Sequence, residues 1–431
     1  MTLAQVIATL IFLLTFAAIM AERFHRTIVA MLGAAVMLIV GMLMGFYSQG
    51  QALAAIDFNT LGLLFGMMLL VRLLEQTGFF EYIAIRISKR SGGRPWLLLL
   101  ILGGTTTVLS MFLDNVTTIV LIVPVSILIA EILGLNPIPL LMAEALLSNI
   151  GGVATLVGDP PNVLIGSAAS LSFVSFLTHL GPIVLVTWVV AVAILYFAFR
   201  RELAERPRHL DALTGLNENE ALREPKNAIR VLITLGAVIL FFFLEGLLHL
   251  QPALIALVGA AAALMWLQPD IDETLRHVEW SVLVFFAALF VLIGGLDASG
   301  VLHRTAGLLA GLAENTPLVA SLGLLWSAAA LSAIVDNIPF TIAMIPVIED
   351  LGGMGLVIMP FWWALALGAG LGGNGTPIGA TANVLTVTLS ARTRTPITTK
   401  VWLRSGLPVT VATCLVASLI FALLWSRMQI P

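Results

Sequence analysis

Apolar runs of about twenty residues, each long enough to cross a bilayer as a helix, recur from one end of this chain to the other. Examples are the runs at 3–20, 27–46, 58–77 and 173–198. Hydrophobic residues make up 59% of the 431 residues and charged residues only 10%, whereas a soluble domain carries about 25% charged residues. The runs are much longer than the short alternating strands of a membrane β-barrel. They therefore predict an all-α polytopic membrane protein.

Other features of the composition narrow the classes of function. The run at 3–20 lacks a basic stretch and a small-x-small cleavage site, so we expect a first membrane span rather than a signal peptide. Cys414 is the only cysteine, which excludes an intrachain disulfide and a metal site built from several thiolates. We expect no cofactor, no metal site, no nucleic-acid partner and no enzymatic activity.

An Asp-Asn dipeptide occurs twice inside apolar sequence, at Asp114 in FLDNVTTIVLIVP and at Asp336 in VDNIPFTIAMIP. At the offset that joins these two aspartates, LLEQTG at 73–78 falls on GLDASG at 295–300. In this alignment an acidic residue and a glycine coincide in the two segments. The coincidence indicates an internal repeat.

The repeat continues through two glycine-rich segments. After a slippage of one residue, GGVATLVGDPPNVL at 151–164 aligns with GGNGTPIGATANVL at 372–385. Matches in one order at nearly one offset are hard to obtain by chance. They predict two homologous halves, 1–199 and 229–431, joined by a polar linker at 200–228.

The number of crossings in each half predicts an inverted repeat. Each half has five crossings if the segment around its Asp-Asn pair is a re-entrant hairpin, and seven if both arms cross; both numbers are odd, so the halves insert in opposite orientations. A polar turn at membrane depth is tolerated only where protein or water surrounds it, which favours hairpins at about 95–134 and 317–352. Glycines and prolines predict broken helices at about 138–165 and 359–390. We thus expect two inverted repeats of five transmembrane helices plus one re-entrant helical hairpin each, with the broken helices at the midplane.

The distribution of basic residues predicts the orientation. If the linker is cytoplasmic, Arg23, Arg26 and most other basic residues at span ends share its side, and only Arg304 and Arg427 fall outside. This pattern predicts a multi-pass protein of the inner (cytoplasmic) membrane with both termini periplasmic.

The acidic residues of the hairpin tips have two interpretations. Aspartate is a favoured helix N-cap, so Asp114 and Asp336 could serve as caps alone. A serine would cap as well without a buried charge, which favours carboxylates that carry protons or bind a cation. Asp159, whose partner in the second half is Ala380, is either a loop cap or a titrating group. The predicted substrate- and proton-binding residues are Asp114, Asn115, Thr117, Thr118, Thr155, Asp159, Asn162, Asp336, Asn337, Thr341, Asn374, Thr376 and Asn383.

The signs of the charges indicate the class of solute. The four motif segments contain three aspartates and no lysine, arginine or histidine. An anion site needs cationic side chains or free helix N-termini. The aspartates therefore favour a cation, a proton or a neutral polar solute.

At these motifs the chain resembles the ArsB/NhaD permeases of the ion-transporter superfamily. FLDNVTTIVLIVPV, ATLVGDPPNVLIGSA, VDNIPFTIAMIPVI and GGNGTPIGATANVL carry the resemblance, which covers nearly the whole chain. The group includes arsenite efflux permeases, NhaD-type sodium/proton antiporters and P-protein-like transporters. The resemblance implies ten spans plus two hairpins, a scaffold domain and a mobile transport domain, elevator-like alternating access, and in many members a homodimer.

The resemblance leads to a first hypothesis and two alternatives. The first is efflux of arsenite and antimonite, as neutral hydroxides that polar side chains can hydrogen-bond, in exchange for protons; it also allows a soluble cytoplasmic ATPase subunit. The second is sodium/proton antiport. Sodium-coupled transport of an organic or inorganic anion is disfavoured, because the related dicarboxylate carriers have Ser-Asn-Thr where this chain has Asp-Asn at the hairpin tips. A scaffold or receptor that transports nothing is a further alternative, disfavoured because binding alone needs no paired broken helices.

Overall fold

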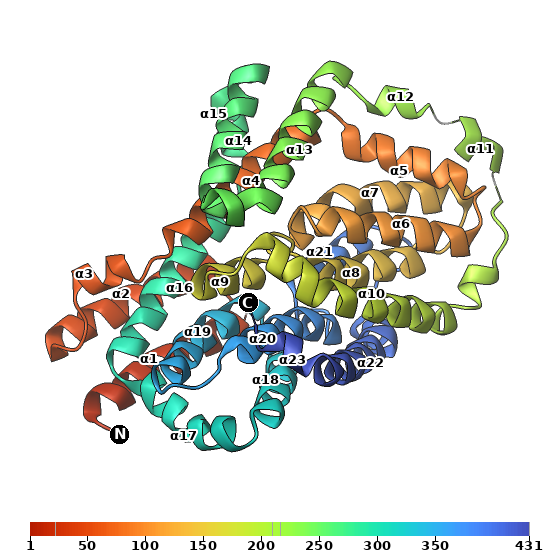
Figure 1. Cartoon of the computed structure of the whole chain (residues 1–431). Coiled ribbons are helices and arrows are strands. Elements are labelled where there is room, and N and C mark those ends of the chain that lie inside the picture. Colours follow the sequence, from red (N-terminus) through yellow and green to blue (C-terminus); the bar gives the residue numbers. More distant parts are fainter. Residues whose placement is uncertain (22, 209, 216, 431) are drawn as a thin grey trace.

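In the computed structural model of the chain, residues 1–21, 23–208, 210–215 and 217–430 are described. They form helices joined by short connections and contain no strand, so the predicted all-α architecture is confirmed (Figure 1). Eight helices in the described residues are long and apolar enough to cross a membrane. They are α1 (Leu3–Met20), α2 (Arg26–Met44), α4 (Phe58–Gln76), α7 (Asn115–Leu133), α10 (Phe173–Ala198), α13 (Pro225–Leu248), α16 (Trp280–Ala298) and α22 (Thr399–Leu423).

Shorter helices complete the two halves. The apolar ones are α6 (Pro95–Ser110), α8 (Ile138–Gly152), α14 (Pro252–Leu267) and α18 (Pro317–Ser332). The others near the centre are α9 (Pro160–Ala169), α19 (Asn337–Gly353), α20 (Met359–Gly372) and α21 (Thr381–Ser390). The peripheral ones are α3 (Gln49–Ala54), α5 (Phe79–Arg90), α11 (Leu210–Gly215), α12 (Glu218–Ala221), α15 (Ile271–Arg276), α17 (Val301–Asn315) and α23 (Trp425–Met428).

One group of helices, which we call the framework, consists of α1, α2, α4, α13, α14 and α16. Within it α2 packs against α16, and α4 packs against α14. At the α4–α14 contact, a Cβ on Gly66 would lie 2.7 Å from the backbone carbon of Ala256, so the two helix backbones approach closely. Small residues at such contacts are typical of membrane helix pairs, which gain little from hydrophobic burial.

A second group, which we call the core, consists of α6–α10 and α18–α22. In it α6 packs on α8, α18 on α20, and α10 on α22. All residues from 139 to 166 and from 360 to 375 are buried. The first stretch contains the whole break between α8 and α9, which is therefore enclosed by the core. The second contains only the start of the break between α20 and α21, which reaches the surface at Ile378, 48% exposed.

The two halves are inverted relative to each other. Gly78 and Gly300, aligned by the repeat, both adopt left-handed backbone angles (φ of 76° and 80°) and cap α5 and α17. The Gly78 turn lies against the linker, where Arg223 donates from its backbone to the Thr77 carbonyl (2.9 Å). The Gly300 carbonyl instead accepts from the Gln5 side chain near the chain start (3.3 Å). Since α15, which precedes α16, packs on α4 and lines a cavity with Gln76, α16 begins where α4 ends.

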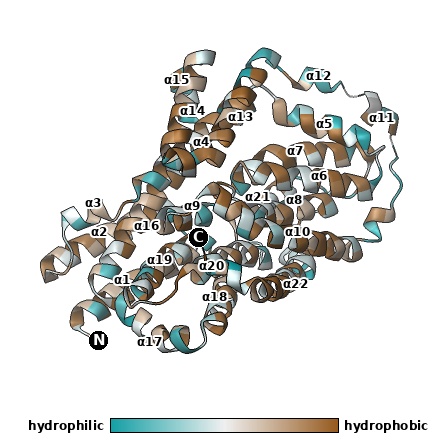
Figure 2. Ribbon diagram, viewed as in Figure 1, coloured by the Kyte–Doolittle hydropathy of each residue, from teal (hydrophilic) through white to brown (hydrophobic). Residues whose placement is uncertain are grey.

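The linker lies along α5. Lys89 pairs with Glu218 of α12, and this hydrogen bond holds the pKa of the Glu218 carboxyl below its ordinary value. Figure 2 shows hydrophilic residues on α5 and α12 and hydrophobic residues along the long helices. Residues 209 and 216 of the linker lie outside the described residues. The boundaries of the two repeats, at 199 and 229, stay a prediction.

Candidate functional site

Both hairpin-tip aspartates are N-caps, as the simpler interpretation required. Asp114 precedes α7 and accepts from the Thr117 amide (2.8 Å) and the Thr117 hydroxyl (2.5 Å), so its own turn occupies both carboxylate oxygens. Asp336 precedes α19 and accepts from the Ile338 amide (3.3 Å) through one oxygen. Its other oxygen is directed toward a different element. The two tips are therefore alike in backbone and different in what their carboxylates bind.

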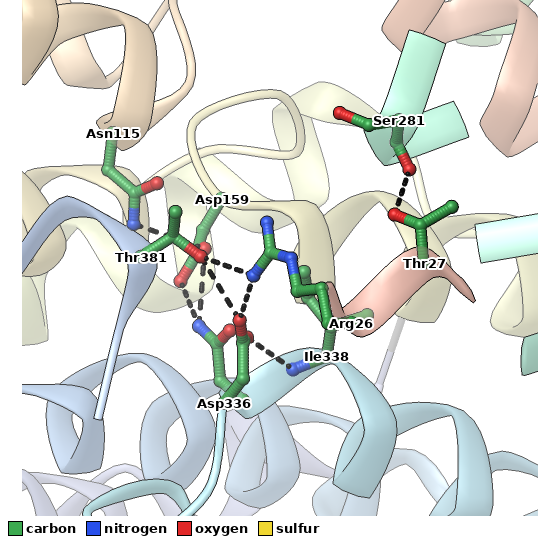
Figure 3. A network of polar contacts seen from close by, with 9 residues as sticks. Arg26, Thr27, Asn115, Asp159, Ser281, Asp336, Ile338 and Thr381 are labelled. Carbon is green, nitrogen blue, oxygen red and sulfur yellow. Dashed lines mark hydrogen bonds and ion pairs between the residues drawn. The ribbon is translucent and has the colours of Figure 1, made fainter. Parts of the chain in front are cut away.

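Asp159 lies between the two hairpin tips. It precedes α9 but makes no capping hydrogen bond with its side chain, and it is 1% exposed. Its carboxylate accepts long hydrogen bonds from the amides of Asn115 (3.4 Å) and Asn337 (3.3 and 3.4 Å), one from each tip (Figure 3). Among the described residues no basic side chain forms an ion pair with it. The structure thus brings together residues of both hairpins around one carboxylate.

An asparagine that was not predicted, Asn149 of α8, connects the halves. Its oxygen accepts from Asn115 (3.0 Å), and its amide donates to Asn374 (2.8 Å) and Asn383 (2.9 Å). It is 1% exposed. The sequence signal that could have identified it is a polar residue two positions before the Gly151-Gly152 pair.

The alignment of the two halves explains why the second half has no counterpart of the Asn149 hydrogen bonds. Asn149 aligns with Gly370, and Val153 aligns with Asn374. Where α8 and α20 cross, Asn149 meets Asn374. At the position related to this one by the repeat, Gly370 faces Val153 so closely that a Cβ on Gly370 would overlap the Val153 side chain. One consequence is that the Asn162 side-chain oxygen, buried, has no hydrogen-bond partner in the protein. Its counterpart oxygen on Asn383 accepts from Asn149.

Asn162 and Asn383 brace the broken helices through their amides. Asn162 donates to three carbonyls, those of Gly152 (3.2 Å), Val153 (3.1 Å) and Thr155 (2.8 Å). Asn383 donates to the carbonyls of Gly373 (2.8 Å) and Thr376 (3.0 Å). These amides satisfy backbone groups that a regular helix would have paired.

The predicted threonines also act mainly on the backbone. The hydroxyls of Thr155 and Thr376 donate to the carbonyls of Met111 and Ala333, and so tie each break to the hairpin beside it. The hydroxyls of Thr118 and Thr341 donate one turn back along the chain, to the backbone carbonyls of Asp114 and Asn337. The threonine side chains are therefore near the centre but hold loops rather than face one another.

Arg26 is a second residue of the candidate site that the sequence reasoning missed. It begins α2, and its guanidinium donates to Asp336 (2.7 Å) and to the Thr381 hydroxyl (2.8 Å) (Figure 3). In the sequence, Arg26 is only one of the basic residues at span ends that predict the orientation in the membrane. Only the packing of α2 beside the second hairpin brings it to an aspartate far away in the chain. The site thus contains one cation as well as three carboxylates.

The charge balance at the site is negative. Arg26 compensates Asp336, which leaves Asp114 and Asp159 without a basic partner among the described side chains. Burying an uncompensated carboxylate costs several kcal/mol, and the cost is avoided when the group takes up a proton or a cation. No group of three or more His, Cys, Asp or Glu side chains in the described part of the chain could hold a metal ion. Chemically, such carboxylates can take up a proton or a small cation.

Comparison with known proteins places these observations in context. A family model described as a citrate transporter matches residues 16–368. A 46 kDa membrane protein of Mycobacterium leprae (strain TN) is 39% identical over 436 residues, which cover 98% of this chain and 99% of that protein. An uncharacterized transporter of Mycobacterium tuberculosis (strain ATCC 25618 / H37Rv) is 40% identical over 433 residues, with the same coverage.

The chain is also similar to a human protein and to a transporter of known structure. The P protein of Homo sapiens is 35% identical over 491 residues, which cover 95% of this chain and 59% of the P protein. A crystal structure of the Alcanivorax borkumensis YdaH transporter, described as having an unusual topology, superposes with a TM-score of 0.64 over 95% of this chain and 100% of that one. Since only 15% of the residues are identical, this last similarity concerns the fold alone.

Proposed function

We propose a function from one premise: this chain belongs to the citrate transporter family, and is a membrane transporter. The transporter is a secondary active one that exchanges protons for a small solute through the site around Asp159. Arsenite and antimonite, in their neutral hydroxide forms, are the solutes we propose first, moved out of the cell as protons enter. The homodimer and the cytoplasmic ATPase subunit that the family resemblance allows stay predictions.

The observation that carries this proposal is the position of Asp159. This carboxylate is 1% exposed and its side-chain hydrogen bonds come from neutral amides, so no positive side chain compensates its charge. Binding a proton or a cation removes the cost of that uncompensated charge. The amides come from both hairpin tips, so a solute that competes for them also competes with the charge on Asp159. Opposite preferences of one site for a proton and for a solute give exchange.

The polar groups around Asp159 suit an uncharged solute with hydroxyl groups. Asparagine amides donate and accept, and aspartate oxygens accept, so a triol can form hydrogen bonds in both directions. Citrate, the solute in the family's description, is a polyanion at neutral pH. It would lie beside three aspartates, and Arg26 is the one basic side chain paired with any of them among the described residues, so we expect citrate to be a poor substrate.

Sodium/proton antiport is the second candidate, and Asn162 favours it. Its buried side-chain oxygen lacks a partner, and it lies in the first turn of α9, three residues after Asp159. A carboxylate and an amide oxygen are ligands that a hard cation prefers. Sodium would then compete with the proton for Asp159.

Proton flux in proteoliposomes tests the proposal. A pH-sensitive dye inside the vesicles reports whether gradients of arsenite, antimonite, sodium, lithium or citrate move protons. We expect a gradient of arsenite or antimonite to drive protons across the membrane in the direction opposite to the solute. Asp159→Asn should abolish this proton movement. Asp272→Asn, which changes an exposed aspartate of α15, is the control and should leave the flux unchanged.

The outcomes separate the candidates. A response to sodium or lithium alone selects the antiport of cations, and a response to citrate alone refutes the charge argument. If no solute moves protons in the unmodified protein, the proposal is wrong.

A further inference from the structure

The framework and the core are joined by an ion pair at the second hairpin tip. Arg26 belongs to α2 of the framework and Asp336 to the core, and their side chains are 2.7 Å apart. Thr381 of α21 accepts from the guanidinium (2.8 Å) and donates to the same carboxylate oxygen (3.1 Å), so three elements meet there. Of the ion pairs in the described residues, this is the one that connects a framework helix to the core.

The surroundings strengthen this ion pair. It lies in a cavity of about 280 Å³ whose other walls are mostly apolar, with Ile19, Phe24, Val335 and Ile378 among them. The guanidinium also lies over the Phe285 ring, 5.2 Å from its centroid. The Asp336 side chain is 15% exposed and that of Arg26 29%. Since water is partly excluded, breaking the pair needs a substitute partner for the carboxylate.

The first hairpin tip has no such pair. Asp114 is bonded only within its own turn, to Thr117. The helix of the second half that corresponds to α2 is α14. Its N-cap and first residue are Gln251 and Pro252, whereas those of α2 are His25 and Arg26. One hairpin is thus anchored to the framework by charge and its counterpart is not.

We propose that Arg26 is a built-in counter-ion that a proton replaces on Asp336 once in each transport cycle. This inference rests on the proposed exchange of protons, to which it adds the site where one proton is bound. A proton from solution adds to the Asp336 carboxylate, the ionic contact with Arg26 is lost, and the hairpin tip is free to move relative to α2. Loss of that proton on the other side lets the pair re-form.

The other charged groups near the pair act in known directions. Asp159 faces the second hairpin tip from the break between α8 and α9, where Asn337, the neighbour of Asp336, donates to its carboxylate. Glu279, at the start of α16, interacts with Arg26 and with Asp114. His25 precedes Arg26 in the chain and is exposed. A negative charge on Asp159 and the positive charge of Arg26 therefore act on the second hairpin tip with opposite signs.

The number of protons exchanged per solute tests this role. We would measure it from the potential at which net flux vanishes in proteoliposomes. In Arg26→Gln, Asp336 has no counter-ion and keeps its proton through the cycle, so one fewer proton should be exchanged per solute. Arg26→Lys should restore the original number. Arg72→Gln, which removes an arginine paired within its own helix to Glu75 (2.8 Å), is the matched control and should not change it.

A second measurement leaves the ion pair intact. Val335, 7% exposed and next to Asp336, is replaced by cysteine in a Cys414→Ala chain, and the rate of thiol labelling is followed against pH. Because the thiolate is the reacting form, each rate is divided by that of the exposed Glu220→Cys at the same pH. We expect this relative rate to rise at least tenfold as the pH falls, and to be high at every pH when Arg26→Gln is added.

The outcomes are decisive. An unchanged proton number in active Arg26→Gln, or a relative labelling rate of Val335→Cys that does not depend on pH when Arg26 is present, overturns the role of Arg26. Absence of solute-driven proton flux in the unmodified protein overturns the proposed function instead.

Discussion

Asp159 and the two hairpin-tip aspartates differ in how much of their binding capacity the protein uses. Asp114 is occupied by its own helix cap, Asp336 by Arg26 and Thr381, and Asp159 only by weak amide contacts. The cap interpretation and the charge interpretation of the sequence are therefore compatible for Asp114 and Asp336. What distinguishes the three residues is the partner, and partners can be tested by substitution.

Asp114→Asn separates the cap from the charge. Asparagine caps a helix nearly as well as aspartate, so we expect the protein to fold with unfolding free energy within about 0.5 kcal/mol of the original. Solute-driven proton flux should fall at least tenfold, because a carboxylate of the site is lost. Asp114→Ala, which removes the cap too, should in addition cost about 1 kcal/mol. Strong pH-dependent exchange by Asp114→Asn would contradict a coupling role.

Asn149→Ala should weaken the whole site. The substitution leaves polar groups of Asn115, Asn374 and Asn383 buried without this partner, at about 1–3 kcal/mol for each unpaired group. We expect a lower melting temperature in detergent and loss of transport. Ser327→Ala, which removes a hydroxyl from the exposed side of α18, is the control and should change the unfolding free energy by less than about 0.5 kcal/mol.

At the scale of elements, close approach of helices is built on glycine. Gly151 of α8 faces α6, where an added Cβ would lie 2.6 Å from the Thr107 carbonyl oxygen. Its repeat counterpart, Gly372 of α20, faces the Ala329 backbone of α18 in the same way. The hairpin arms can thus lie against the broken helices only because both positions lack a side chain.

Gly372→Ala should destabilise the core. The new methyl group would force α18 and α20 apart, and such overpacking costs about 1–3 kcal/mol. Gly323→Ala in α18, where an added Cβ meets no atom within 4 Å, is the matched control. It should be neutral or stabilise by up to about 1 kcal/mol, since alanine favours helix. Thermal unfolding of both variants in one detergent compares them, and equal stability would contradict the packing argument.

The paired turns at Gly78 and Gly300 provide a second comparison. Both residues have φ near 80°, where alanine costs about 1–2 kcal/mol. An alanine at Gly78 would also overlap the Ala221 carbonyl oxygen of the linker, whereas at Gly300 the nearest atom, of Gln5, lies 3.5 Å away. Gly78→Ala should therefore be the more destabilising and should expose the linker to limited proteolysis. Identical effects of the two changes would show that the linker does not rest on this turn.

At the scale of the molecule, the opposite directions of α4 and α16 make the framework a pair of inverted units. The linker contacts the end of α4, and the chain start contacts the end of α16. Residues on the linker and residues near Gly300 must therefore lie on opposite sides of any membrane that the framework spans. The positive-inside pattern predicts which side is which.

Single cysteines test this orientation. On a Cys414→Ala background, Glu220→Cys places a thiol on the linker and Asn315→Cys places one at the end of α17, both exposed. We expect an impermeant thiol reagent to label Asn315→Cys in intact cells, and Glu220→Cys only after the membrane is permeabilised. The reverse pattern would invert the predicted topology without changing the fold.

The sequence predicted those parts of the molecule that repeat. Asp114, Asp336 and the two glycine-rich segments stand out because duplicated residues mark them, and glycine and proline report backbone breaks locally. Arg26 and Asn149 could not be found in this way. Neither aligns with a residue of its own type, and the contact that gives each its role depends on how α2 or α8 packs against the other half of the chain.

The crossing of α8 and α20 also determines whether either half could exist alone as a symmetric pair. Two copies of the first half would place Asn149 against Val153 twice, with amide groups facing methyl groups. Two copies of the second half would place Gly370 against Asn374 twice, so that neither Asn374 side chain has the asparagine partner it has here. Neither arrangement pairs its asparagines, so at this crossing the two halves are complementary rather than identical, and the site needs one of each.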